Sequence, residues 1–67
     1  MNKFAERLKE SLKSKEMSQS ELARILKLSQ TTVNKYCSGE REPTLDSLML
    51  ICQTLNESAD YMLGLID

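Results

Sequence analysis

Residues 18 to 39 constrain the fold of this chain more than any other stretch, because they contain two short helical patterns close together. Ser18 is followed three residues later by Glu21, which is the pattern of a capping box and predicts a helix start. Ser29 is a second candidate N-cap, and Gly39 is a suitable residue to end the helix that follows it. The segment therefore predicts two short helices joined by a tight turn.

Apolar residues recur at helical spacing along the whole chain, and no segment alternates in the manner of a half-buried strand. Thr44 and Ser58 are candidate N-caps of the fourth and fifth helices. The last predicted helix is the weakest, because Gly64 interrupts it. Short connections between the helices favour a compact all-α five-helix bundle, and a chain of 67 residues makes one domain, residues 1–67. The predicted helices cover about residues 3–15, 19–27, 30–38, 45–55 and 59–65.

The composition argues against an enzyme and against a cofactor or metal site. Histidine, the commonest general base and metal ligand, is absent. Cys37 and Cys52 do not form a C-x-x-C pair, and we expect both to be buried and inert, with a redox or disulfide role as the alternative. The longest apolar run, residues 48–52, is too short to span a bilayer, and no signal peptide is recognisable at residues 1–7. We expect a cytoplasmic protein.

The charge of the chain is unevenly distributed, although its net value is only −1. All nine basic residues lie at or before position 41 and share that span with five acids, which gives it a charge of +4. Residues 42–67 contain five acids and no base. A positive half that carries the two capped helices favours nucleic acid as a partner, although a surface with ordinary charged helices is the alternative.

One set of residues keeps a characteristic spacing along the chain: Gln19, Leu22, Ala23, Leu26, Leu28, Ser29, Thr32, Val33, Ser38, Gly39, Arg41, Pro43, Thr44, Leu45, Leu48, Ile51 and Leu55, with 58–65 at the C-terminal end. Over about positions 4 to 66 this pattern resembles the lambda-repressor-like, Cro-type family of helix-turn-helix regulators. Two departures from the family pattern stand out. Lys27 occupies a position where the family commonly has glycine, and either a phosphate contact or simple tolerance of backbone strain explains it. Leu12 and Cys37 replace an arginine–glutamate pair that many relatives contain, and apolar packing can substitute for such a pair.

The resemblance implies sequence-specific binding of double-stranded DNA by a transcriptional regulator, a repressor in preference to an activator, with the third helix in the major groove. One domain makes too few base contacts to select a single genomic site, so we also expect a homodimer on a palindromic operator, and no small-molecule ligand is apparent. The base-reading candidates are Gln30, Thr31, Asn34 and Lys35. The phosphate-contacting candidates are Gln19, Lys27, Ser38, Arg41 and Thr44. The candidate dimer interface consists of Tyr61, Met62, Leu63, Leu65 and Ile66.

A different class of function competes with this interpretation. The acidic C-terminal half and its apolar residues also suit a protein-binding module, for example an antitoxin-like partner that uses the same fold. Binding to DNA that falls steeply with added salt would separate the two, because phosphate contacts release counterions.

Overall fold

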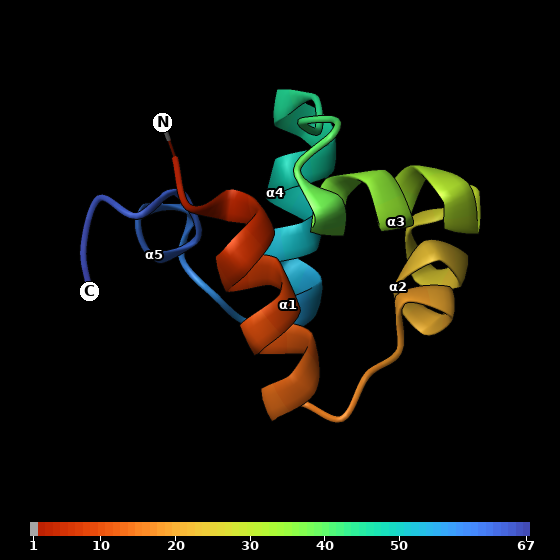
Figure 1. Cartoon of the computed structure of the whole chain (residues 1–67). Coiled ribbons are helices and arrows are strands. Elements are labelled where there is room, and N and C mark those ends of the chain that lie inside the picture. Colours follow the sequence, from red (N-terminus) through yellow and green to blue (C-terminus); the bar gives the residue numbers. More distant parts are fainter. Residues whose placement is uncertain (1) are drawn as a thin grey trace.

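Five helices joined by short loops make up residues 2–67, the part of the chain that the computed structural model describes (Figure 1). Within that range there is no strand, so the predicted all-α five-helix fold is confirmed. The helices are α1 (Phe4–Ser14), α2 (Gln19–Leu26), α3 (Gln30–Ser38), α4 (Leu45–Leu55) and α5 (Ala59–Leu63).

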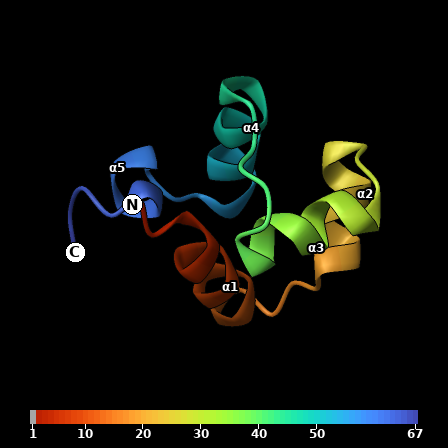
Figure 2. The same cartoon turned by 45° about the horizontal axis from the view of Figure 1, so that its top comes forward.

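Helices α1 and α4 form the middle of the molecule, with α2 and α5 at opposite ends (Figures 1 and 2). Helix α3 packs against both α1 and α2, while α5 packs against α1 and α4. A backbone hydrogen bond of 3.2 Å, from Lys3 N to Leu63 O, also joins the start of α1 to the end of α5. The N- and C-terminal segments therefore lie together, away from α2.

The predicted N-caps of four helices are confirmed. The hydroxyl groups of Ser18, Ser29, Thr44 and Ser58 each accept a hydrogen bond from the backbone N–H three residues later, at the starts of α2 to α5. In α2 the capping box is complete, because the Glu21 carboxylate also accepts from Ser18 N at 3.1 Å. Each cap satisfies an otherwise free amide and contributes about 1 kcal/mol.

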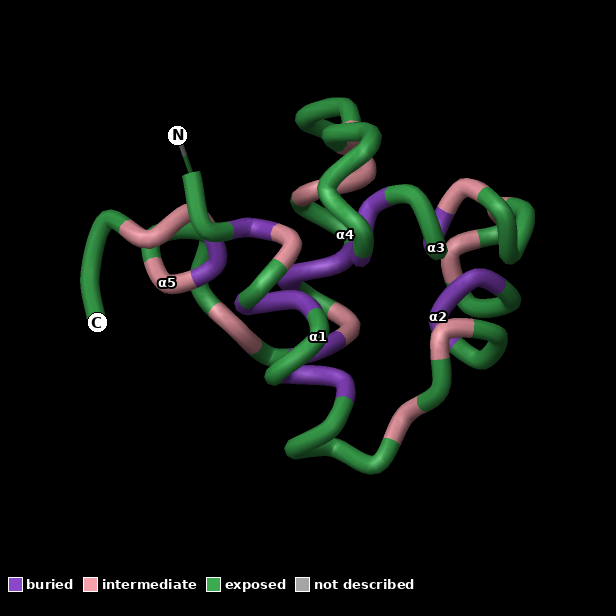
Figure 3. The backbone as a smooth tube through the Cα atoms, viewed as in Figure 1, coloured by how far each residue is buried: buried purple, intermediate pink, exposed green. Residues whose placement is uncertain are grey.

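The core takes at least one completely buried side chain from every helix, so no helix is dispensable (Figure 3). The Phe4 and Tyr36 rings meet edge to face at the α1–α3 contact, with centroids 6.4 Å apart. The completely buried side chains are Leu8, Leu22, Val33, Ile51, Leu55 and Met62.

Leu12 and Cys37, the residues that stand in place of the family's ion pair, are both buried in this core. Apolar packing therefore occupies the place of two opposite charges. Burial raises the pKa of the Cys37 thiol, against a smaller opposing effect of Lys9, and burial together with Glu57 raises the pKa of Cys52. Both cysteines are free and buried, as predicted, and a raised pKa keeps a thiol in its unreactive form.

Three predicted helices extend beyond their observed ends, and two of them, α2 and α5, end for the same reason. Lys27 and Gly64 have positive φ angles of 58° and 84°, so α2 ends at Leu26 and α5 ends at Leu63. At each of these helix ends, the backbone N–H groups of the next two residues donate hydrogen bonds to carbonyl groups of the last helical turn, which is the Schellman motif. Asn56 ends α4 in the same way, at its predicted end. Helix α1 ends at Ser14, one residue before the predicted end, and the left-handed Glu16 follows it with the same pair of backbone hydrogen bonds.

Lys27 adopts the left-handed conformation that glycine tolerates and other residues adopt at a cost of roughly 1 kcal/mol. We therefore predict that Lys27→Gly raises the free energy of unfolding by about 1 kcal/mol, because it relieves this strain. Urea denaturation measures the change, with Lys27→Asn as an intermediate control. An unchanged or lowered stability of Lys27→Gly would show that the lysine side chain stabilises the turn.

Candidate nucleic-acid interface

The crossing of α2 and α3 determines how α3 is held. Ala23 from α2 and Val33 from α3 are both buried there, with Leu28 of the connecting turn partly buried beside them. The turn is fixed at both ends, by the left-handed Lys27 and by Ser29, whose hydroxyl accepts from Thr32 N at 3.1 Å. The side chains of Ser29 and Thr32 also hydrogen-bond to each other at 2.8 Å. The first turn of α3 therefore starts from a rigid support.

Helix α3 buries one side and exposes the other. Val33, Tyr36 and Cys37 lie in the core, packed towards α1 and α2. All four base-reading candidates are exposed on the opposite side. Because residues four apart are neighbours on a helix, Gln30 lies beside Asn34 and Thr31 beside Lys35. We call this surface the α3 polar face, which consists of Gln30, Thr31, Asn34 and Lys35.

The α3 polar face is chemically suited to the edges of base pairs. Amide side chains form bidentate pairs with adenine, lysine donates to guanine, and the threonine methyl group fits thymine. Among residues 2–67 there is no hydrogen bond or ion pair to any of these four side chains. Their donors and acceptors are therefore available to an external partner.

Four of the five phosphate-contacting candidates are exposed. Lys27 and Arg41 are free of ion pairs within the described residues, while Gln19 is half-buried in the first turn of α2. Ser38 and Thr44 already serve the fold: the Ser38 hydroxyl donates to Lys35 O at 3.1 Å, and that of Thr44 accepts from Ser47 N. The Thr44 hydroxyl keeps its proton for a further hydrogen bond.

Asn2, which sequence reasoning missed, connects the loop that carries Arg41 to the start of α1. Its Oδ1 accepts from Phe4 N at 3.0 Å, and its Nδ2 donates to the Glu42 carboxylate at 2.7 Å. Asparagine two residues before a helix start is a common local cap, so the sequence did contain a signal for this role.

The C-terminal candidates do not form one exposed surface. Met62 is completely buried in the core, so its predicted place in a dimer interface is wrong. Tyr61 and Leu63 are half-buried, whereas Leu65 is 72% exposed and Ile66 is also exposed. Among these C-terminal candidates the exposed apolar surface therefore consists mainly of Leu65 and Ile66.

Arg7 holds this C-terminal segment in place, and sequence reasoning did not identify it. Its Nη1 donates to Tyr61 O at 2.8 Å and to Ile66 O at 3.3 Å, and its guanidinium lies 4.2 Å from the centre of the Tyr61 ring. The carbonyls and the ring thus balance a buried charge that has no carboxylate partner in the described residues. Position 7 lies on the same helical stripe as Phe4 and Leu8, and this spacing is the sequence signal for the burial of Arg7.

Among residues 2–67 no helix has the length and apolar character needed to cross a membrane. The same residues hold no group of three or more side chains suited to binding a metal ion.

Comparisons with known proteins agree with this geometry. A family model described as helix-turn-helix matches residues 8–62. The crystal structure of a transcriptional regulator from Listeria innocua is similar to this fold, with a TM-score of 0.90 and 27% sequence identity. That match covers 100% of this chain and 63% of the other, so this chain spans less than two thirds of that protein. No curated protein sequence matches this chain.

We predict that Arg7→Met lowers the free energy of unfolding by about 2 kcal/mol, because it leaves two carbonyls without their charged donor. Arg7→Lys should recover only part of the loss, since an ammonium group cannot stack flat on the Tyr61 ring. Chemical denaturation measures stability, and hydrogen exchange at residues 64–66 reports release of the segment. Equal exchange in the native protein and in Arg7→Met would contradict this role of Arg7.

Proposed function

Because the chain belongs to the lambda-repressor-like helix-turn-helix family, we propose that it binds double-stranded DNA sequence-specifically as a transcriptional regulator. The single observation that carries the proposal is the α3 polar face, which is exposed and lacks partners within the described residues. The proposed activity requires no metal or cofactor. It requires access to DNA, which agrees with the cytoplasmic location expected from the sequence.

In the proposed complex α3 enters the major groove. A helix of nine residues is about 14 Å long, and the groove of B-DNA is about 12 Å wide, so the first turns of α3 reach the base edges. Gln30 and Asn34 would pair with adenines, Thr31 would contact thymine or a phosphate, and Lys35 would donate to guanine.

Groups around the α3 polar face would grip the two backbones without reading the sequence. At the first turn of α2, Gln19 and the free amides suit a phosphate. Arg41, Ser38 and Thr44 lie at the other side, in and around the loop after α3. Lys27 adds a positive charge beside the turn. The positive charge of residues 1–41 supports this arrangement. Although the net charge of the whole chain is −1, the half of the chain that would face the DNA is positive.

We also propose that the protein acts as a homodimer on a palindromic operator. A few base contacts worth about 1–3 kcal/mol each are too few to select one genomic site, and a second copy doubles them. The half-sites would lie about 34 Å apart, which is one helical turn of DNA. The interface would use Leu65 and Ile66, with the exposed parts of Tyr61 and Leu63. Repression is the simplest outcome, because occupancy of a promoter suffices for it.

A protein-binding module is the second candidate function, and the acidic half of the chain favours it. Residues 42–67 contain no base, so this half would repel DNA and attract a basic protein. If this were the only function, binding to duplex DNA would be weak and would show no sequence preference.

Base reading and phosphate gripping respond differently to substitution. Gln30→Ala or Asn34→Ala should weaken binding to the best duplex by about 1–3 kcal/mol and relax the preference at one base position. Arg41→Ala should weaken binding to all duplexes alike. It should also reduce the slope of the logarithm of affinity against the logarithm of salt concentration by about one, because one phosphate contact is lost. Competition between duplexes chosen from a random pool measures both effects. A uniform loss of affinity in Gln30→Ala would argue against base reading by Gln30.

Dimerisation through the C-terminal segment can be tested by sedimentation. Leu65→Asp should be monomeric at concentrations where the native protein is dimeric, because two copies would then bring aspartates into an apolar contact. Since Leu65 is 72% exposed, the fold should persist. Leu50→Asp, on an exposed side chain of α4, is the matched control and should still dimerise. A native protein that stays monomeric at high micromolar concentration would refute a dimer that forms without DNA.

A further inference from the structure

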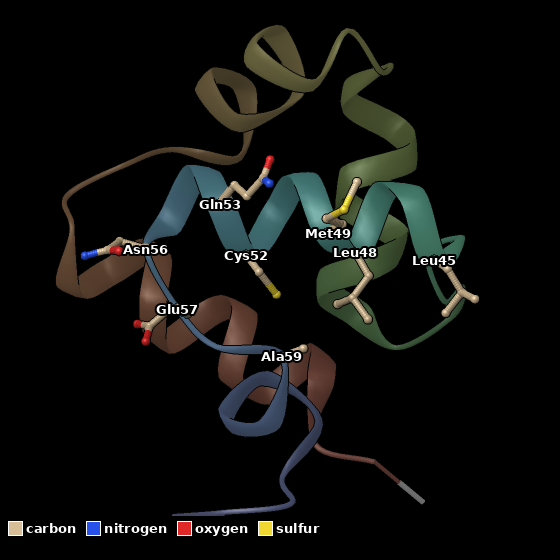
Figure 4. Close-up of a pocket in the computed structure, with 8 residues that line it drawn as sticks. All are labelled: Leu45, Leu48, Met49, Cys52, Gln53, Asn56, Glu57 and Ala59. Carbon is tan, nitrogen blue, oxygen red and sulfur yellow. The ribbon is translucent and has the colours of Figure 1, made fainter.

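An apolar groove lies between α4 and α5, and no part of α2 or α3 lines it. Figure 4 shows Leu45, Leu48 and Met49 along the first turns of α4, with Cys52 directed towards Ala59 of α5. The groove has a volume of about 430 Å³. Its lining is apolar at the Leu45 end and polar at the other, where Gln53, Asn56 and Glu57 complete it.

The exposure of this lining is not required by the fold. Helix α4 faces the core with Ile51, Cys52 and Leu55, whereas Leu45 is 85% exposed and Met49 is 53% exposed. Leu45 and Met49 are one turn apart and therefore adjoin each other on the helix surface. Adjacent exposed apolar side chains beside a groove are typical of a surface that binds a partner.

One acidic residue lines the groove, and two more are next in sequence to residues that line it. Asp46 follows Leu45 in the first turn of α4, and Asp60 follows Ala59 in the first turn of α5, and both are exposed. The carboxylate of Glu57 lies at the polar end and accepts from Lys15 Nζ at 3.2 Å. Lys15 comes from outside the segment, since residues 42–67 contain no base. The segment that forms the groove, residues 45–59, thus contains two acids and no base.

We propose that this groove binds an amphipathic helix of another protein, whose apolar side chains enter the groove and whose lysines or arginines meet the acidic surroundings. The charge decides between occupants. A second copy of this chain would bring the same acids face to face, which disfavours it, whereas a basic helix is complementary. Leu45 to Cys52 spans about 10 Å, enough for two apolar side chains one turn apart on the partner.

This surface is separate from the α3 polar face and from the exposed residues after α5. The groove shares no lining residue with either surface, and the proposal does not depend on the DNA-binding function. Because the groove is tested without DNA, failure of one proposal leaves the other standing.

A fluorescein-labelled helical peptide of about four turns, with leucines at i, i+4 spacing and lysines beside them, tests the proposal by fluorescence anisotropy. We expect saturable binding that weakens with salt. Met49→Ser should lower the affinity about tenfold, through loss of one buried side chain. Leu50→Ser is the matched control: Leu50 is 45% exposed on the same helix but does not line the groove, and its affinity should be unchanged.

The charge is tested separately. Joint replacement Asp46→Asn and Asp60→Asn should weaken binding and reduce its salt dependence, and circular dichroism checks that all variants are folded. The proposal is overturned if the basic peptide fails to bind, if it binds Met49→Ser as tightly as the native protein, or if a glutamate version of the peptide binds equally well. It is also overturned if Met49→Ser reduces self-association in sedimentation but leaves peptide binding unchanged, because the occupant would then be a second copy.

Discussion

The burial of Val33, Tyr36 and Cys37 is the constraint on which the rest of the molecule depends. A short helix that buries one side against α1 and α2 has no freedom to rotate, so its opposite side is presented to solvent in a fixed direction. Ala23 allows the close approach of α2, and Ser29 fixes where α3 begins. The geometry of the α3 polar face is thus a consequence of core packing. Its chemistry is free to differ from that of relatives without a cost to the fold.

The two halves of the chain divide the remaining tasks. Residues 1–41 carry all the basic side chains and the helices proposed to meet DNA. Residues 42–67 are acidic and carry the exposed apolar surfaces, and Arg7 joins the halves by holding the segment after α5. Net charge conceals this division, because the two halves nearly cancel. Attraction to DNA at one surface and to a basic protein at another are compatible in a molecule of this size.

Much of the fold could be predicted from the sequence because its signals are local. Capping residues Ser18, Ser29, Thr44 and Ser58 and apolar spacing located every helix, and the exposure of the α3 polar face follows from the same periodicity. Signals that depend on tertiary contact were not readable. The role of Arg7 needs the carbonyls of residues more than fifty positions away, and the burial of Met62 needs the docking of α5. The groove beside α4 likewise forms only when α5 packs beside α4, so no sequence pattern within α4 alone predicts it.

Amide chemical shifts of the protein, followed by NMR during titration with a duplex selected from a random pool, test the central claim most directly. If α3 enters the major groove, the largest changes fall on residues 30–35, with smaller changes at Gln19 and Arg41 and few in α5. Changes confined to α4 and α5, or a pool from which no sequence is enriched, would contradict the assignment of α3 as the element that reads DNA.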